Sequence, residues 1–228
     1  MAWHREHLPE PLPDEPLRLA QEWLAEAARR ALQPNPNAMV LATADATGRP
    51  SARVVLCKQI VPQPGLLTFY TNYESHKGRE LAENPRAAIV MHWDALHRQV
   101  RVEGRILRVS AADSDAYFAT RNWQSRLGAW ASQQSQPIAS RAALLAKVAK
   151  TALRLALPAP SGDEQANDPG IRIARPPHWG GYQLWAEAVE LWVEGSARIH
   201  DRARWSRTLQ ERPDGFDCGP WSATRLQP

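Results

Sequence analysis

The chain contains only two cysteines, Cys57 and Cys218, among its 228 residues. Two cysteines are too few for a disulfide-stabilised fold, and no Cys-x-x-Cys spacing marks a structural zinc site. Hydrophobic residues make up 43% and charged residues 23% of the sequence, which is usual for a globular protein. These proportions exclude the collagen-like and disordered classes, and a chain of this length is expected to form one compact domain.

Long apolar runs are absent as well. No segment approaches the roughly 18 apolar residues of a membrane span. The most apolar helical stretch, 142–157, is interrupted by Lys147, Lys150 and Arg154. The first seven residues lack the apolar core of a secretory signal. The sequence therefore predicts a soluble, cytoplasmic protein that has no membrane partner.

The motifs of several enzyme classes are missing. There is no Gly-x-Gly-x-x-Gly or P-loop pattern for nucleotides, no His-Glu-x-x-His and no Gly-x-Ser-x-Gly. The seven histidines lack the spacing of metal ligands, so we predict no metal site. Ten tryptophans are compatible with stacking on single-stranded nucleic acid, but a net charge of +4 is small for that task. No nucleic-acid partner is expected.

Lysine is scarce: four of the 28 basic side chains are lysines, which leaves 24 arginines. A guanidinium group is well suited to bind carboxylates and phosphates. A bias in codon usage accounts for an arginine-rich chain equally well.

The pattern of apolar residues and turns predicts a mainly β protein with helical additions, arranged as an antiparallel barrel. Residues 1–16 are rich in proline and are predicted to form an extended arm, and residues 158–178 a flexible loop. Helices are predicted at 17–32, 75–83 and 111–120. Strands are predicted at 38–44, 51–58, 66–71, 87–93, 99–109, 181–184, 189–193, 197–202 and 221–226.

One candidate site is the segment 197–202. If it is a strand, Arg198, His200 and Arg202 share one face, and Trp192 lies on the preceding strand. Three basic groups in a row repel one another unless an anion or an electron-rich ring lies over them. The alternative is a strip of solvated basic side chains.

A second candidate is formed by Tyr117, Arg121 and Ser125, whose spacing of four places them on one face if the segment is helical. A phenol, a guanidinium and a hydroxyl together suit a phosphate dianion. The alternative is a capped helix end with an exposed arginine.

Two further segments carry cations next to apolar strands. Arg53 and Lys58 bound one strand and point to opposite faces if it is regular, unless they are simply charged strand ends at the solvent. The segment 75–79 follows the strand 66–71, and the first turn of a helix there offers free N–H groups to an anion.

Taken in order, these segments resemble the pyridoxine/pyridoxamine 5′-phosphate oxidase family from about residue 17 to the C-terminus. The resemblance implies an FMN-binding split β-barrel and a homodimer with two flavin sites at the subunit interface. The segments that carry it are 53–58 (RVVLCK), 69–72 (FYTN), 75–77 (SHK), 98–100 (RQV), 117–121 (YFATR), 128–135 (GAWASQQS), 176–182 (PPHWGGY), 190–192 (ELW), 198–202 (RIHDR) and 225–228 (RLQP).

The resemblance also implies roles for individual residues. FMN is expected to contact Arg53, Val54, Val55, Leu56, Cys57, Lys58, Tyr70, Thr71, His76, Lys77, Gln99, Gln134, Ser135, Trp192 and Arg202. The substrate phosphate is expected to contact Lys58, Tyr117, Arg121 and Ser125. Arg198 and His200 are expected at the substrate ring as catalytic residues.

The implied reaction is hydride transfer from C4′ of pyridoxamine or pyridoxine 5′-phosphate to flavin N5, with dioxygen as the final acceptor and peroxide as product. One alternative is a related split-barrel flavoenzyme with another ligand, such as a phenazine-biosynthesis oxidase. Another is a flavin- or pyridoxal-phosphate-binding protein without turnover. The joint presence of Lys58, Tyr117, Arg121 and Ser125 favours a phosphorylated vitamer.

The chain departs from the family pattern at several positions. His76 stands where arginine is usual, and because imidazole titrates near neutral pH, the affinity for the flavin phosphate is expected to depend on pH. Cys57 and Arg126 stand where leucine and glutamine are expected. The arm lacks an Arg-x-x-Tyr segment, and the loop at 158–175 is longer.

Overall fold

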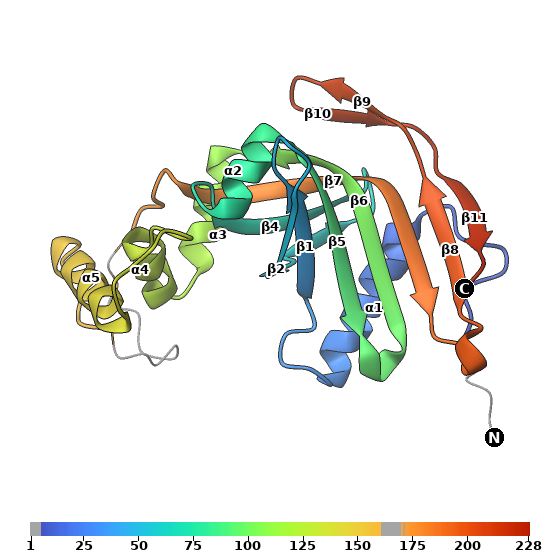
Figure 1. The fold of residues 1–228 in the computed structure, drawn as a ribbon, viewed down its shortest axis with the longest axis horizontal. Helices are drawn as coiled ribbons and strands as arrows, with labels where there is room; N and C mark the ends of the chain where they lie inside the picture. Colours follow the sequence, from blue (N-terminus) through green and yellow to red (C-terminus); the bar gives the residue numbers. More distant parts are fainter. Residues whose placement is uncertain (1–5, 161–169, 171) are drawn as a thin grey trace. The chain divides into compact units, whose positions relative to one another are not determined.

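A computed structural model describes residues 6–160, 170 and 172–228 (Figure 1). The chain divides into two units. The first unit comprises Met1–Phe69, Glu80–Leu107 and Gln183–Pro228, and the second comprises Tyr70–Arg79 and Arg108–Tyr182. Part of the loop predicted at 158–178, namely 161–169 and 171, lies outside the described residues.

The first unit contains most of an antiparallel sheet whose strands differ in length. Its elements are α1 (Pro16–Arg30), β1 (Ala38–Ala44), β2 (Pro50–Leu56), β3 (Gln59–Val61), β5 (Arg86–Trp93), β8 (Asp201–Ser206), β9 (Leu209–Arg212), β10 (Gly215–Cys218) and β11 (Ser222–Leu226). The main strand order is β11-β8-β7-β6-β5-β1-β2, and β9 and β10 form a separate hairpin.

The second unit is mainly helical, with α3 (Ala111–Thr120), α4 (Trp123–Ala131) and α5 (Arg141–Arg154). Four elements contain residues of both units, because the division falls within them: β4 (Leu66–Asn72), α2 (His76–Glu83), β6 (Arg98–Arg108) and β7 (Trp179–Val193).

Most of the predicted elements form, because their side-chain periods match their burial. Along β6 buried and half-buried residues alternate, as expected for a strand that covers a core with one face. Helix α1 begins with Pro16 after the N-cap Glu15, whose carboxylate accepts the N–H of Leu17. It ends at Arg30, and the C-cap Ala31 has a left-handed backbone (φ +48°). The structure thus confirms a mainly β fold with helical additions.

The prediction of two strands at 181–184 and 189–193 is wrong, because both belong to the single strand β7. Alanine and glutamate between them favour helices rather than strands, but tertiary burial overrides this preference. Trp185, Ala186 and Ala188 are buried, and the N–H of Ala186 donates to the carbonyl of Gly65 at 3.0 Å.

The prediction of a strand at 197–202 is also wrong, since β8 begins only at Asp201. Ala197 and Arg198 adopt left-handed backbone angles (φ +54° and +64°) in a short 3-10 helix. The chain folds back so tightly that a Cβ at Gly195 would lie 1.6 Å from the carbonyl oxygen of Ile199. Arg198 and His200 therefore do not alternate with Arg202 along one strand.

Tyr117, Arg121 and Ser125 do not lie on one continuous helix either. Helix α3 ends at Thr120, and Arg121 has extended backbone angles (φ −75°, ψ 148°). Asn122 then starts α4, because its side chain accepts the N–H of Gln124 at 2.8 Å. Helix α4 itself, the strand β3 and the hairpin β9–β10 were not predicted from the sequence.

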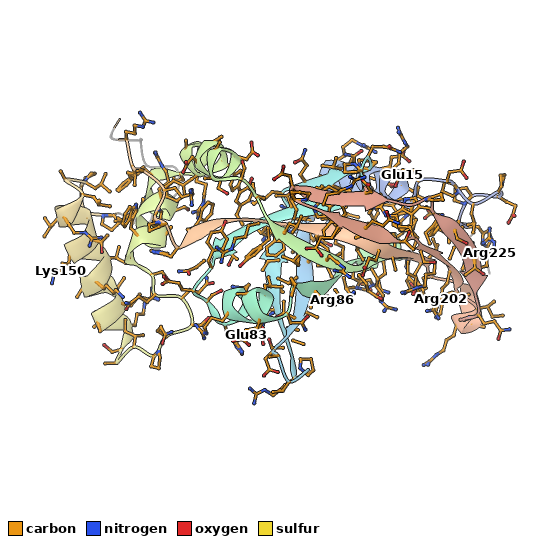
Figure 2. The ribbon with its side chains drawn as sticks, turned by 90° about the horizontal axis from the view of Figure 1, so that it is seen from above. Glu15, Glu83, Arg86, Lys150, Arg202 and Arg225 are labelled. Atoms are coloured by element: carbon orange, nitrogen blue, oxygen red, sulfur yellow. The ribbon has the colours of Figure 1, made fainter. Side chains whose placement is uncertain are left out.

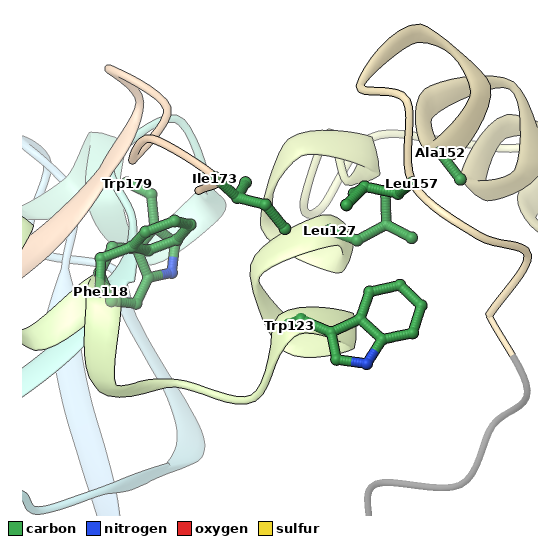
Figure 3. Packing of buried hydrophobic residues seen from close by; sticks show 7 residues of the cluster. All are labelled: Phe118, Trp123, Leu127, Ala152, Leu157, Ile173 and Trp179. Atoms are coloured by element: carbon green, nitrogen blue, oxygen red, sulfur yellow. The ribbon is translucent and has the colours of Figure 1, made fainter. Parts of the chain in front are cut away.

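The second unit has an aromatic core of its own. The cluster, shown in Figure 3, consists of Phe118, Trp123, Leu127, Ala152, Leu157, Ile173 and Trp179, which are all buried. Helices α4 and α5 and the start of β7 therefore share one apolar cluster. In the described part of the chain, every helix is too short or too polar to cross a lipid bilayer.

The described part of the proline-rich arm, residues 6–15, packs against other elements of the first unit. Leu8 is buried, and its N–H donates to Asp201 at 2.8 Å. Arg225 donates to Asp201 and Glu10, and the indole N–H of Trp205 donates to the carbonyl of Pro13. Residues 6–15 are thus tied to strands β8 and β11.

Candidate functional site

Lys77 forms the centre of a polar cluster in the second unit. Its side chain is buried although it lies in the first turn of α2. The ammonium donates to Gln134 Oε1 at 2.7 Å, Thr71 Oγ1 at 3.1 Å and Ser75 Oγ at 3.2 Å. These three oxygens are neutral, and they fix the direction of the ammonium.

The start of α2 adds backbone donors to this cluster. The N–H of His76 donates to Ser135 Oγ at 3.2 Å, and Ser135 has a left-handed backbone (φ +70°). Gln134 and Ser135 thus both face the first turn of α2, where the helix dipole is positive. The structure brings together five residues predicted to contact FMN: Thr71, His76, Lys77, Gln134 and Ser135. A buried ammonium beside a helix start fits a phosphate group.

A pH effect is expected at this cluster, because His76 is exposed at the helix start. Only a protonated imidazole adds positive charge, so we expect FMN to bind more weakly at higher pH. His76→Arg should remove most of this dependence. The measurement is the Kd of FMN from fluorescence quenching across the pH range, with riboflavin, which lacks the phosphate, as the control ligand. Parallel curves for the two proteins would show that His76 does not act on the phosphate.

Three aromatic rings stack in the second unit. Tyr70 and Tyr117 lie with ring centroids 3.9 Å apart at an interplanar angle of 17°, and Trp179 lies nearly parallel, 5.5 Å from Tyr70. Burial and, secondarily, the neighbouring Tyr117 raise the pKa of Tyr70, which keeps its phenol protonated. Trp179 had no predicted role, although it lies in a segment that carries the family resemblance.

Arg121 lies over this stack with unused hydrogen-bonding capacity. Its guanidinium carbon is 4.7 Å from the centroid of Trp179. Its Nη1 is buried, and among the described residues no acceptor reaches that atom. Burial lowers the pKa of the Arg121 guanidinium, opposed by Tyr117, but arginine remains charged at neutral pH. A half-buried cation whose buried Nη1 has no acceptor among the described residues fits an anionic ligand. Ser125 lies half-buried on α4.

In the first unit, Arg53 is held by a buried acidic group. Its Nη1 donates to Thr43 Oγ1 at 2.5 Å, and its Nη2 contacts Ser51 and, at 3.2 Å, Glu80. Glu80 also accepts from Thr43 and Ser51. Sequence reasoning missed Glu80, because nothing in its local pattern distinguishes a buried carboxylate from a solvated one. The family resemblance assigns both Arg53 and Lys77 to FMN. Because the two residues belong to different units, this joint contact stays a prediction.

The rest of the segment 53–58 runs from β2 into a loop. Val54 is exposed, Val55 and Leu56 are half-buried, and Cys57 is buried. Because β2 ends at Leu56, strand alternation does not determine the direction of the exposed Lys58. Burial raises the pKa of the Cys57 thiol to about 12, so this thiol stays protonated and is not a nucleophile at neutral pH.

The strands β7 and β8 bring Trp192 and Arg202 directly opposite each other. The rings of Trp192 and His200 have centroids 4.7 Å apart, and His200 Nδ1 accepts the N–H of Gly195 at 3.2 Å. Arg198 is exposed, and Gln99 on β6 is half-buried opposite His92 of β5. The first unit therefore gathers Trp192, His200 and Arg202, although the predicted strand is absent.

Two family models match most of this chain. Residues 24–154 match the family model described as pyridoxamine 5′-phosphate oxidase. Residues 179–228 match the model of the pyridoxine 5′-phosphate oxidase C-terminal dimerisation region.

Among the curated relatives, a pyridoxine/pyridoxamine 5′-phosphate oxidase of Paracoccus denitrificans is 45% identical over 94% of this chain and 96% of its own. The protein of the same name from Paraburkholderia phytofirmans is 47% identical over 93% and 89% of the two chains.

Solved structures show the same fold. PhzG from Burkholderia lata, in complex with tetrahydrophenazine-1-carboxylic acid, is similar with a TM-score of 0.77 and 30% identity, over 95% of this chain and 94% of its own. A pyridoxamine 5′-phosphate oxidase-related, FMN-binding protein from Nostoc punctiforme has a TM-score of 0.63 and 18% identity over 93% and 97% of the chains. These likenesses confirm the predicted split β-barrel with helical additions.

Proposed function

This chain belongs to the pyridoxamine 5′-phosphate oxidase family, and we propose that it converts pyridoxamine and pyridoxine 5′-phosphate to pyridoxal 5′-phosphate in an FMN-dependent reaction. The observation that carries the proposal is Arg121, a half-buried guanidinium over stacked aromatic rings, whose buried Nη1 has no acceptor among the described residues. A ligand that combines an anionic group with a flat ring suits this arrangement.

The Lys77 cluster supports FMN as the cofactor. In this proposal the first turn of α2 would donate hydrogen bonds to the FMN phosphate and the Lys77 ammonium would add positive charge beside it, while Thr71, Gln134 and Ser135 hold Lys77 and His76 in place. The phosphate would then lie at the positive end of the helix dipole. FMN, when bound, supplies the acceptor for a hydride from C4′ of the substrate.

In this proposal the substrate phosphate is bound by Tyr117, Arg121 and Ser125, which all belong to the second unit. Arg121 donates from Nη1, and the phenol and hydroxyl groups add neutral hydrogen bonds. Fixing the phosphate restricts the position of C4′, which is how binding at a distance promotes a reaction.

Arg198 and His200 act at the substrate ring in this proposal. Because His200 Nδ1 accepts the N–H of Gly195, its Nε2 carries the ring proton in the neutral form and can donate to the substrate. Arg198 provides a permanent positive charge. For the amine substrate, water replaces the nitrogen, which leaves as ammonia, and dioxygen takes up two electrons and two protons as hydrogen peroxide.

The protein is proposed to act as a homodimer with its sites at the subunit interface. The support is the match of residues 179–228 to the dimerisation region of the family. This region includes β8 and β11 and the predicted ligand contacts Trp192, Arg198, His200 and Arg202.

A second candidate is the oxidation of a reduced phenazine carboxylic acid. It is favoured by the likeness to PhzG and its bound tetrahydrophenazine-1-carboxylic acid. A carboxylate can also accept from Arg121, so the two candidates differ in whether a phosphate is required.

The test is the visible spectrum of the purified protein under anaerobic conditions. We expect a yellow, dimeric, FMN-containing protein whose flavin absorption bleaches on addition of pyridoxamine 5′-phosphate but not of unphosphorylated pyridoxamine. Bleaching by tetrahydrophenazine-1-carboxylic acid alone would replace the first candidate by the second. A protein that binds pyridoxamine 5′-phosphate without bleaching, or that contains FAD, would contradict the proposal.

A further inference from the structure

Glu190 is a buried carboxylate on β7 that joins two arginines. Its side chain is only 3% exposed. Its Oε1 accepts from Arg202 twice, from Nη2 at 2.8 Å and from Nε at 3.1 Å. Its Oε2 accepts from Arg101 Nη1 at 3.1 Å. The paired contact with Arg202 is the geometry that fixes the plane of a guanidinium group.

A third contact completes the fixation of Arg202, which is labelled in Figure 2. Its Nη1 donates to the carbonyl oxygen of Gln227 at 3.0 Å. A guanidinium has five N–H groups, and these contacts use one on each of its three nitrogens. Among the described residues, one donor on each terminal nitrogen is therefore left for a ligand.

The neighbouring ion pair between Arg204 and Glu103 explains why Glu190 binds Arg202. In the β7–β8 register, Glu190 stands directly opposite Arg204 rather than Arg202. Arg204, however, binds Glu103 with two hydrogen bonds, at 2.9 and 3.2 Å. Glu103 thus engages the direct cross-strand partner, and Glu190 reaches diagonally to Arg202.

The diagonal contact lies beside Trp192. Glu190 and Trp192 are two residues apart on β7, so their side chains share one face of the sheet, and Trp192 stands opposite Arg202. The carboxylate, the indole and the guanidinium therefore lie side by side on neighbouring strands.

We propose that Glu190 is a positioning residue for the flavin site, which holds the Arg202 guanidinium in a fixed plane next to Trp192 so that its free N–H groups meet FMN. The inference rests on the proposed function, in which Trp192 and Arg202 contact FMN. Glu190 itself does not touch the cofactor. It restricts the rotamers of Arg202 before binding, which reduces the entropy lost when FMN binds.

The test compares FMN binding in Glu190→Gln with that in a matched control. The glutamine keeps the size of the side chain but loses the charge and one acceptor oxygen, so the two arginines are no longer both satisfied. We expect the Kd of FMN, measured by fluorescence quenching of apoprotein titrations, to rise about tenfold. In the Arg202→Ala background the same substitution should change the Kd less than about twofold, because nothing is left to position.

The control is Glu187→Gln on the same strand. Glu187 also joins two arginines, Arg86 at 2.8 Å and Arg105 at 3.3 Å, but none of the three is predicted to contact FMN. The Kd of FMN for the Glu187→Gln variant should stay within about twofold of wild type, even if its thermal stability changes. Equal Kd values for both variants, or the same effect of Glu190→Gln with and without Arg202, would overturn the inference and leave Glu190 a structural ion-pair partner.

A second variant covers the case in which Glu190→Gln does not fold. Glu190→Asp keeps the charge but shortens the reach, and it should give a rise in Kd that disappears in the Arg202→Ala background. A rise that persists there overturns the inference. Failure of the FMN assignment, the part of the proposed function on which the inference rests, has a different signature, since the wild-type protein would then not bind FMN at all.

Discussion

Replacement of Arg121 by alanine is expected to raise the KM for pyridoxamine 5′-phosphate about ten- to a hundredfold while FMN stays bound. A charge-assisted hydrogen bond to phosphate contributes roughly 1.5–3 kcal/mol, which corresponds to this range. In the proposed function the substrate phosphate accepts from Arg121 Nη1, which has no acceptor among the described residues. A fall in kcat as well would mean that the phosphate contact also positions C4′ for hydride transfer.

The measurement is steady-state peroxide release together with the flavin content from absorbance. Arg121→Lys should recover only part of the loss, because an ammonium lacks the planar pair of donors. Arg154→Ala is the matched control, since Arg154 also lies over a tryptophan of the second unit, at 5.7 Å from the ring of Trp130. A variant that loses flavin but keeps its KM would move Arg121 from the substrate to the cofactor.

Replacement of Lys77 by methionine is expected to weaken FMN binding about ten- to a hundredfold, because the phosphate loses the attraction of a buried positive charge. Methionine has a similar length and no cost of burying a charge. The apoprotein should therefore melt at the wild-type temperature or above it, while added FMN stabilises the variant less than the wild type. Opposite effects on the apoprotein and the complex distinguish a ligand-binding lysine from a structural one.

Lys147→Met provides the control for this experiment. Lys147 lies in the same unit and also donates to a glutamine amide at 2.7 Å, that of Gln133, but it is not part of the predicted site. Its substitution should leave the FMN Kd within about twofold of wild type. If Lys77→Met binds FMN as tightly as this control does, the phosphate lies elsewhere.

The polar cluster around Lys77 shows how far residue patterns lead. The sequence singled out Thr71, His76, Lys77, Gln134 and Ser135 through a family resemblance, and the structure brings them into one network. Ser75 was not among the predicted FMN contacts, yet its hydroxyl oxygen is one of the three that orient the ammonium. Ordered motifs identify the reactive groups well, but they omit the neutral residues that support them.

The segment 117–125 shows where local periodicity fails. A spacing of four predicts that Tyr117 and Arg121 share a helical face, but the helix stops at Thr120 because Asn122 caps a new one. Arg121 still reaches the aromatic stack, through an extended linker rather than through a helical turn. Tyr117 and Arg121 both lie at the aromatic stack, but the backbone that presents them was not predicted.

The sequence by itself determined the elements with a clear period, such as β1, α1 and α3, because burial on one face repeats every two or about 3.6 residues. Only the tertiary structure decided which charged groups are buried and with whom they pair. Glu80 and Glu190 look like ordinary surface carboxylates in the sequence. Yet Arg53 of β2 binds Glu80 of α2, and Arg202 and Arg101 bind Glu190 of β7. Tertiary packing sets these contacts between residues distant in sequence, and a local pattern contains no information about them.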